Sequence, residues 1–460
     1  MREEEIRVLA ATAMLGSGFL ETSFEEGLRR KPHLIGCDAG TTDSGPYSLG
    51  LGKASFSRDA TKRDLRIMMK GARRLGIPLF VGSAGTAGGD LNLEFTKKIV
   101  LEIAAEEGLH FKLAVIHAEQ SKDDLKRRFR AGKIKPLINA PEMSEALIDR
   151  SEHIVGMMGA EPFLKAMDNG ADMVLAGRSS DTAIYAGLPV RQGFPEGLAW
   201  HAAKILECGT SSATKRPTPD SLLCSIRMDH FAVETMDPEL VCTPQSVAAH
   251  SLYENGNAFE LAESSGVLDL TKSIYTANAD GRTVSVSGSS FRKAPVYTVK
   301  LEGAEKAGYM SVIVAGMRDP YIIRQIDDWL ARLKEKVRLR VVGVYGEEFA
   351  KSGYTFNVRI YGKNAVMGPI EPVKEIRGHE IGLVMEITST SQEIASSIAS
   401  ITRHQALHLP IPEWNGAITT IALPYNPSYM ERGALFRFNM NHVVEVDDPC
   451  EMFPIEYFDL

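Results

Sequence analysis

Residues 33–46, HLIGCDAGTTDSGP, constrain the fold of this chain more than any other stretch. Their apolar part, residues 34–37, predicts a buried strand. It ends in a loop that holds two carboxylates, Asp38 and Asp43, among glycines, threonines and a serine. In an open parallel sheet, ligands bind beyond the carboxyl ends of the strands. The stretch therefore predicts such a sheet, with a ligand site at the end of this strand.

Further apolar runs in the first half of the chain end in loops of the same kind. A strand is expected over residues 6–11, and others over residues 78–81, 111–116, 153–158 and 172–176. Amphipathic segments between them predict helices. We therefore expect residues 1–209 to form an α/β ligand-site domain with an open, mostly parallel sheet whose loops converge on one site.

The second half of the chain has a different pattern. Residues 210–221, TSSATKRPTPDS, are rich in Ser, Thr and Pro and predict a linker. Short alternating runs downstream predict antiparallel strands, with a helix over residues 320–337, a strand over residues 339–344 and a helix over residues 392–407. Residues 222–460 are therefore expected to form an α+β domain with a mixed sheet. A chain of 460 residues is long for one core, which agrees with two domains.

Composition excludes several classes of protein. The net charge of -7 disfavours a nucleic-acid-binding groove, which needs a concentrated basic face. Five cysteines without a CxxC spacing exclude the usual zinc and iron–sulfur patterns and disfavour a disulfide framework. The acidic start, MREEE, is unlike a secretory signal, and no apolar run reaches the length of a membrane span. We expect a cytoplasmic protein without a membrane partner.

The glycine-rich loop over residues 82–89, GSAGTAGG, is a candidate anion cradle. Its small residues, Ser83, Gly85 and Thr86 among them, let backbone N–H groups turn toward a phosphate or carboxylate, and a helix follows. The loop matches neither the GxGxxG nor the GxxxxGK[ST] fingerprint, so a nucleotide-dependent enzyme has little support. Lys53 would suit the same anionic substrate, although an exposed basic residue before a helix is the alternative.

Three further loops carry candidate site residues. His117 and Glu119 follow a strand end, where they could share a substrate proton or ligate a metal, or form a hydrogen-bonded loop pair. Glu161 occupies the next Gly-rich turn. The third of these loops, AGRSSDTA, covers residues 176–183. Arg178 could form a bidentate hydrogen-bonded pair with a substrate carboxylate beside Ser179 and Asp181, or it could pair with Asp181 inside the loop.

Two spots in the second half could also reach a ligand, namely residues 378–380 and Trp414-Asn415-Gly416. His404 and His408 have the spacing of a metal pair on a helix, but the glutamate of HExxH is missing. Core or surface histidines are the favoured interpretation of that pair.

Taken together, residues 37–46, GSAGTAGG, GMMGAEP (residues 156–162) and AGRSSDTA resemble the acyclic terpene utilisation family, the AtuA-like proteins. The resemblance extends over nearly the whole chain. It implies a role in the catabolism of branched or unsaturated carboxylic acids, often as CoA esters. It implies no particular catalytic residues, so the candidate site residues rest on the loops alone.

The loops favour a lyase, most simply a hydro-lyase acting on a small hydroxylated or unsaturated carboxylic acid or its CoA ester. Asp38 would be the base, His117 the acid, and Arg178, Lys53 and the amides of residues 82–89 would hold the anion. The alternative is a non-catalytic subunit that binds an acyl group or a carboxylate for a larger complex.

No cofactor is required by the sequence, although a divalent metal ion between Asp38, Asp43 and Glu119 is possible. A homo-oligomer is expected, with a small partner subunit as a further possibility.

Overall fold

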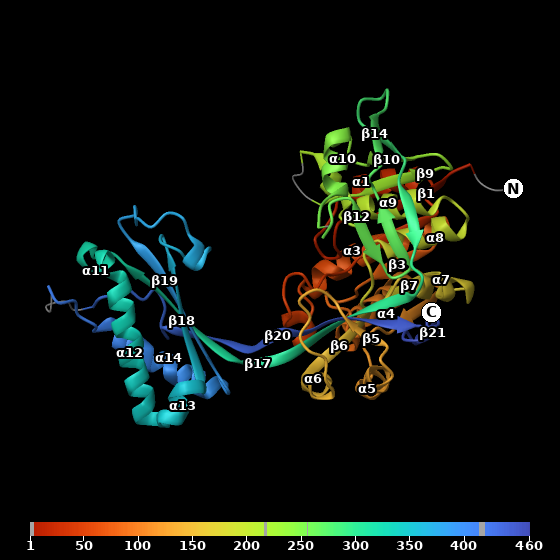
Figure 1. Cartoon of the computed structure of the whole chain (residues 1–460). Coiled ribbons are helices and arrows are strands. Elements are labelled where there is room, and N and C mark those ends of the chain that lie inside the picture. The colour runs from red at the N-terminus through yellow and green to blue at the C-terminus, as the bar shows by residue number, and fades with distance from the viewer. Residues whose placement is uncertain (1–3, 216–218, 255, 414–418) are drawn as a thin grey trace. The chain divides into compact units, whose positions relative to one another are not determined.

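The structure is a computed structural model that describes residues 4–215, 219–254, 256–413 and 419–460 (Figure 1). It has two compact units. Unit 1 consists of residues 1–305 and 437–460, and unit 2 of residues 306–436. The predicted α/β fold class is confirmed, because a large mixed sheet is combined with helices and smaller antiparallel sheets.

The main sheet of unit 1 has ten strands. They are β1 (Ile6–Ala10), β2 (Leu34–Asp38), β3 (Leu79–Gly82), β4 (Lys112–Ile116), β7 (Met173–Ala176), β9 (Leu222–Ile226), β10 (Phe231–Thr235), β14 (Ile274–Ala277), β15 (Val284–Ser287) and β21 (Ile455–Asp459). Their order is β14-β15-β10-β9-β1-β2-β3-β7-β4-β21. The five central strands from β1 to β4 are parallel, and antiparallel strands extend the sheet on both sides.

This order explains why the units divide the chain differently from the predicted domains. Strand β9 pairs with β1, so the segment after the predicted linker adds strands to the first sheet instead of starting a new domain. Of the predicted linker, residues 216–218 lie outside the described residues.

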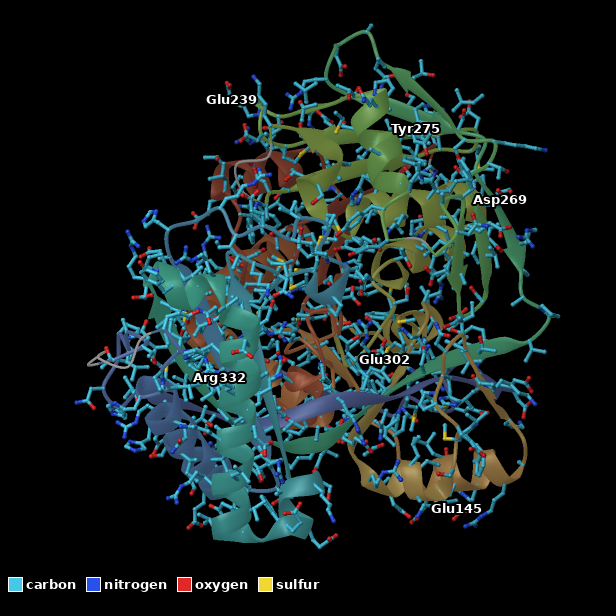
Figure 2. The ribbon with its side chains drawn as sticks, turned by 60° about the vertical axis from the view of Figure 1, so that its left-hand side comes forward. Glu145, Glu239, Asp269, Tyr275, Glu302 and Arg332 are labelled. Carbon is cyan, nitrogen blue, oxygen red and sulfur yellow. The ribbon has the colours of Figure 1, made fainter. Side chains whose placement is uncertain are left out.

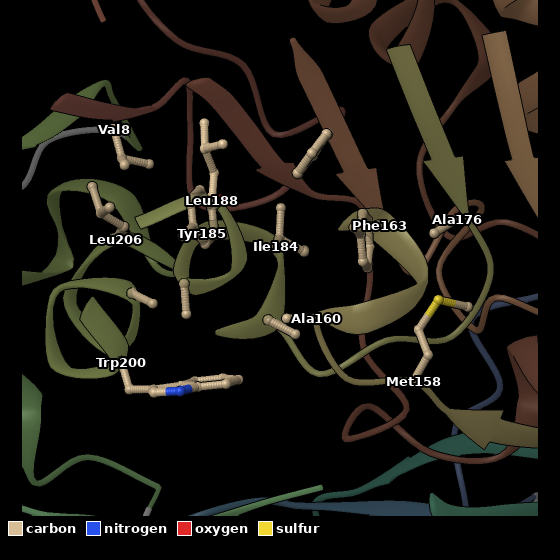
Figure 3. Close-up of a cluster of buried hydrophobic side chains, with 14 of the residues drawn as sticks. Val8, Met158, Ala160, Phe163, Ala176, Ile184, Tyr185, Leu188, Trp200 and Leu206 are labelled. Carbon is tan, nitrogen blue, oxygen red and sulfur yellow. The ribbon is translucent and has the colours of Figure 1, made fainter. Parts of the chain in front are cut away.

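Neighbouring residues of a strand point to opposite faces of the sheet, so each face of the main sheet carries its own apolar side chains. Helices cover both faces. The helices of unit 1 are α1 (Glu21–Arg29), α2 (Tyr47–Leu51), α3 (Arg58–Leu75), α4 (Asp90–Glu107), α5 (Lys122–Arg130), α6 (Glu145–Arg150), α7 (Glu161–Asp168), α8 (Ala183–Arg191), α9 (Glu196–Leu206) and α10 (Pro244–Ser251). Leu9 of β1 packs with buried residues of α1, α3 and α4. Val8 packs on the other face with Phe163 of α7, Ile184 of α8 and Trp200 of α9 (Figure 3).

The remaining strands of unit 1 pair outside the ten-stranded sheet. They are β5 (Ile134–Pro136), β6 (Ser151–Met157), β8 (Ala213–Thr214), β11 (Val241–Cys242), β12 (Glu260–Glu263), β13 (Gly266–Asp269), β16 (Ser290–Lys293), and parts of β17 (Tyr297–Met317) and β20 (Tyr429–Val446). Strand β6 is where the sequence predicts a strand, but it pairs antiparallel with residues 300–305 of β17. It is therefore not part of the parallel sheet that its apolar run suggested.

Unit 2 packs helices on one face of an antiparallel sheet. Its elements are the other parts of β17 and β20, α11 (Pro320–Arg324), α12 (Ile326–Tyr345), α13 (Glu347–Ser352), β18 (Tyr354–Tyr361), β19 (Ile381–Ser389) and α14 (Gln392–Leu407). Trp329 and Leu333 of α12 contribute to a core with Ile313 of β17 and Met385 of β19. The strand predicted over residues 339–344 is wrong, since these residues continue α12.

The predicted strand positions of the parallel sheet agree with β1, β2, β3, β4 and β7 to within about a residue at most ends. Among the described residues, no helix is both long and apolar enough to cross a membrane.

Candidate functional site

Unit 1 contains a cavity of about 480 Å³ beyond the carboxyl ends of its parallel strands. The loops after β1, β2 and β7 and the segments at α9 and α10 supply its walls. This is the position at which open α/β sheets bind ligands. The lining residues are Ala13, Met14, Asp38, Thr41, Asp43, Asp181, Glu207, Cys208, Ser211, Ala213, Ser246, Ala249, His250, Tyr253 and Glu254.

Asp38, the last residue of β2, is the most deeply buried carboxyl of the cavity wall. Its side chain is only 4% exposed, and Oδ1 accepts a hydrogen bond from the backbone N–H of Gly40 at 3.2 Å. Burial raises the pKa of Asp38 well above its usual value, and the charge of Asp181 raises it further. Both effects shift Asp38 toward its protonated form.

Asp181, in the loop after β7, has a different environment. Its side chain is partly exposed where it lines the cavity, and Oδ1 lies 3.6 Å from Nη1 of Arg178. Loss of solvent raises the pKa of Asp181 to about 6, with the charge of Arg178 opposing the shift and that of Asp43 adding to it. At neutral pH Asp181 is mainly ionised, whereas burial shifts Asp38 toward its protonated form.

A second carboxyl of the wall, Glu207, is paired with Lys204. Both side chains are buried, and Lys204 Nζ donates to Glu207 Oε1. Burial alone would lower the pKa of Lys204, but the adjacent charge of Glu207 raises it. The ammonium group is therefore held in an ion pair within the wall of the cavity.

Arg178, which does not line the cavity, is paired with Glu302 of β17. Figure 2 labels Glu302. Nε of Arg178 donates to Oε2 of Glu302 at 2.9 Å, and Thr42 donates to the same oxygen at 3.1 Å. Burial alone would raise the pKa of Glu302, but the charges of Arg178 and Lys300 lower it to about 2. Glu302 therefore holds the loop after β2 through Thr42 and the loop after β7 through Arg178.

Three of the predicted substrate or catalytic residues meet at the cavity, namely Asp38, Asp43 and Asp181. Ser83 and Ser179 are fully buried beside Arg178, and Ser83 Oγ accepts hydrogen bonds from Arg178 Nη1 and from the Ser179 N–H, each at 3.3 Å. They support the Arg178 loop and do not line the cavity.

The glycine-rich loop is packed against the loop after β2. All of residues 82–89 are buried, and the N–H of Thr86 donates to the carbonyl of Ala39 at 3.2 Å. Gly40 allows this approach, since a Cβ there would lie 2.1 Å from Cα of Thr86. Gly85 has a φ of +69°, and a Cβ there would meet the carbonyl of Asn92 at 2.2 Å. The loop therefore joins two strand ends by backbone contact.

The predicted catalytic residues His117 and Glu119 lie in a separate group after β4. Nδ1 of His117 contacts Oδ1 of Asp90 at 2.9 Å. Glu119 accepts hydrogen bonds from the N–H of Asp90 at 2.8 Å and from Nδ1 of His153 at 2.5 Å. Neither predicted residue lines the cavity that contains Asp38.

Two other predicted residues also lie elsewhere. Glu161 accepts a hydrogen bond from the hydroxyl of Tyr297 at 2.5 Å and lines a second cavity of about 270 Å³ beside Trp200. Lys53 is exposed and lines neither cavity.

The structure also bears on the possible metal ion. Within the described ranges, no group of three or more His, Cys, Asp or Glu side chains is arranged to hold one. Glu119 in particular is not beside Asp38 and Asp43, which removes the ligand set considered for a divalent ion.

Sequence reasoning did not predict the part of the wall that comes from later segments, which includes Glu207, Cys208, His250, Tyr253 and Glu254. It also did not predict Lys204 and Glu302, which form ion pairs next to the cavity without lining it. One signal was available. Lys204 and Glu207 are charged residues spaced three apart in the otherwise apolar stretch AAKILEC, which is typical of a buried ion pair. The predicted spot at Trp414-Asn415-Gly416 lies outside the described residues.

A mixed sheet with five central parallel strands, helices on both faces and a cavity at the strand ends defines an α/β protein with a candidate small-molecule site. Residues 61–212 match the family described as acyclic terpene utilisation family protein AtuA, which confirms the predicted resemblance over this segment. The segment includes Arg178, Asp181 and Glu207, whereas Asp38 and Asp43 precede it. No curated protein and no solved structure matches the chain.

Proposed function

We propose that this protein is a hydro-lyase, a hydratase or dehydratase, acting on a small hydroxylated or unsaturated branched carboxylic acid or its CoA ester. One observation carries the proposal: Asp38 and Asp181 line the same cavity in different surroundings, since Asp38 is buried and shifted toward its protonated form, while Asp181 is partly exposed beside the charge of Arg178. Two carboxyl groups separated in this way are the usual basis for assigning an acid and a base. The AtuA-family match of residues 61–212 is consistent with carboxylic acid catabolism.

The chemistry assigned to the two groups is a β-elimination. The Asp181 carboxylate accepts the proton on the carbon next to the carbonyl, the electrons of that C–H bond form the carbon–carbon double bond, and the C–O bond to the hydroxyl breaks. The Asp38 carboxyl donates its proton to the departing hydroxyl, which leaves as water. Proton exchange with solvent then resets both groups, and the reverse sequence hydrates the double bond.

This assignment differs from the roles that the sequence suggested. Burial favours a protonated Asp38, so the base role passes from Asp38 to Asp181. The acid role passes from His117 to Asp38, because His117 contacts Asp90 outside the cavity.

The test uses the full chain in deuterium oxide with a β-hydroxy acid and with its thioester, followed by proton NMR. We expect loss of the vinylic product and of exchange at the α carbon in Asp181→Asn, by about 10²- to 10⁴-fold. Asp38→Asn should slow elimination while α-carbon exchange continues, since its base is intact. Glu239→Gln, an exposed carboxyl of unit 1 that does not line the cavity, is the matched control (Figure 2).

Wild-type rates in Asp181→Asn would contradict the proposal. Binding in the cavity without exchange or elimination would instead support the second candidate, a non-catalytic acyl- or carboxylate-binding subunit. The cations nearest the cavity, Arg178 and Lys204, are already held in ion pairs. This arrangement is also compatible with a protein that binds its ligand without catalysis.

A further inference from the structure

Five of the fifteen residues that line the cavity are acidic. Among the described residues that line it, none is a lysine or an arginine. The acidic members of the wall are Asp38, Asp43, Asp181, Glu207 and Glu254. A ligand that enters this space therefore meets hydrogen-bond acceptors and negative charge.

The two cations behind the wall are committed to other partners. Lys204 is 3% exposed and paired with Glu207, and Arg178 is 6% exposed and held by Glu302. Releasing Lys204 would leave the buried Glu207 without its ammonium partner, and releasing Arg178 would leave the buried Glu302 with Lys300 alone, so both changes are unfavourable. Neither can serve a substrate carboxylate unless an existing pair is broken.

The glycine-rich loop offers no substitute for these cations. Its N–H groups at Ser83, Ala84 and Thr86 donate to the carbonyls of Gly177, Ala176 and Ala39, at 2.9, 3.0 and 3.2 Å. These donors are therefore used to join strand ends.

We infer that the cavity accepts the acyl group of its substrate in an uncharged form, as an ester, thioester or amide, and excludes the free carboxylate. The inference deepens the proposed function and rests on this cavity being its substrate site. A carbonyl oxygen accepts a hydrogen bond from a protonated carboxyl such as Asp38, and it places no negative charge beside Asp181. The proposed elimination acts on a carbon next to a carbonyl, so an acyl group is required and the acidic lining decides between its neutral and its anionic form.

The test compares probes that differ mainly in charge. Crotonate, crotonamide and crotylamine share a carbon skeleton, and the N-acetylcysteamine thioester of crotonic acid adds an uncharged acyl donor. Their dissociation constants for the full chain are measured by ligand-observed NMR at pH 7.5 and low salt. We expect crotonamide and the thioester to bind at least about tenfold more tightly than crotonate, with a smaller difference at high salt.

Two variants connect the selectivity to the cavity. Ala249→Phe places a ring at an exposed position of the wall and should abolish binding of the thioester without affecting the core. Asp43→Asn removes one exposed negative charge of the wall. It should tighten crotonate binding by up to about fivefold and change crotonamide binding less, because crotonamide carries no charge. Glu239→Gln should leave all four dissociation constants unchanged.

The outcomes separate this inference from the proposed function. Crotonate binding as tightly as crotonamide overturns the charge selectivity, while elimination of a free β-hydroxy acid would still uphold the hydro-lyase. Crotylamine binding most tightly also overturns the inference and indicates a cation site. Binding of every probe that persists in Ala249→Phe overturns both proposals, because the cavity is then not the site.

Discussion

Glu302 and Arg178, which are 124 residues apart in the sequence, form an ion pair through Nε and Oε2 at 2.9 Å. Both side chains are buried. Thr42 donates to the same carboxylate at 3.1 Å, so one glutamate of β17 joins the loop after β2 to the loop after β7. These are the loops that bring Asp38 and Asp181 to one cavity. The position of the acid and the base thus depends on a residue that lines no part of the cavity.

Replacing Glu302 with glutamine should therefore destabilise unit 1 strongly. The substitution breaks the buried pair and leaves the guanidinium of Arg178 with only the partly exposed Asp181 nearby, and breaking such a buried pair costs on the order of 3–5 kcal/mol. The pKa of Glu302 is lowered to about 2, so its pair stabilises the fold above the ordinary glutamate pKa and loses that effect as the pH falls through the folded value. The deficit of Glu302→Gln, measured by urea denaturation, should be full at pH 7 and smaller at pH 3.

A matched surface pair provides the control for this measurement. Glu145 contacts Arg130 through two hydrogen bonds of 2.7 and 2.8 Å, but its side chain is 39% exposed (Figure 2). Glu145→Gln should change the denaturation midpoint only slightly. Equal effects of the two substitutions would show that burial of the Glu302 pair is not what stabilises the loops.

The parallel sheet could be predicted because its strands are buried on both faces and so appear as continuous apolar runs. Asp38 and Asp181 could be predicted as candidate site residues because they follow two of these apolar runs. The order of strands in space could not be predicted from the order in sequence. Strand β7 lies between β3 and β4, which separates His117 on the β4 loop from the cavity.

Long-range partners account for most of what the sequence did not reveal. Strand β6 has the apolar pattern of its neighbours, but its register is decided by residues 300–305 of β17. The side chain that holds Arg178 likewise comes from Glu302, far along the chain. Hydrophobic periodicity identifies an element but not the partner that it pairs with.

The contact between the glycine-rich loop and the β2 loop can be tested at Gly40. A methyl group there would lie 2.1 Å from Cα of Thr86, and backbone on both sides cannot rotate away. Gly40→Ala should lower the free energy of unfolding by about 1–3 kcal/mol, the usual cost of overpacking. It should also reduce ligand binding, because the loop that carries Asp43 must move.

Gly343→Ala is the control for that change. Gly343 lies within α12, and a Cβ there meets nothing within 4 Å. Alanine at this position should be neutral or stabilising by about 0.5–1 kcal/mol, since glycine is unfavourable inside a helix. A stability of Gly40→Ala equal to that of the wild type would contradict the close approach of the two loops.

The group after β4 should give unit 1 a pH-dependent stability. The contact with Asp90 raises the pKa of His117, while partial burial opposes the shift. A raised histidine pKa stabilises the fold fully below the unfolded value of about 6.5, and the effect is lost as the pH rises through the folded value. Asp90→Asn should therefore lower the melting temperature more at pH 6 than at pH 8.5.

Asp149→Asn separates this effect from the general loss of a carboxylate. Asp149 pairs with Lys126 at 2.5 Å, and a lysine stays charged across the same pH interval. Its melting-temperature change should be the same at both pH values. A pH-independent effect of Asp90→Asn would mean that His117 is not stabilised by this contact.

The pH profile of the proposed elimination offers a test at a position where folding is not disturbed. Asp43 is exposed at the cavity, and its charge raises the pKa of Asp181, which stands at about 6. If Asp181 is the base, kcat/KM falls as the pH drops through that value. Asp43→Asn should lower the pKa of Asp181 and move this acid limb to lower pH by a few tenths of a pH unit.

The displacement should shrink at high ionic strength, because salt screens exposed charges, and Glu239→Gln should leave the limb in place. An acid limb that moves to higher pH in Asp43→Asn, or does not move at low salt, would show that a group other than Asp181 accepts the proton.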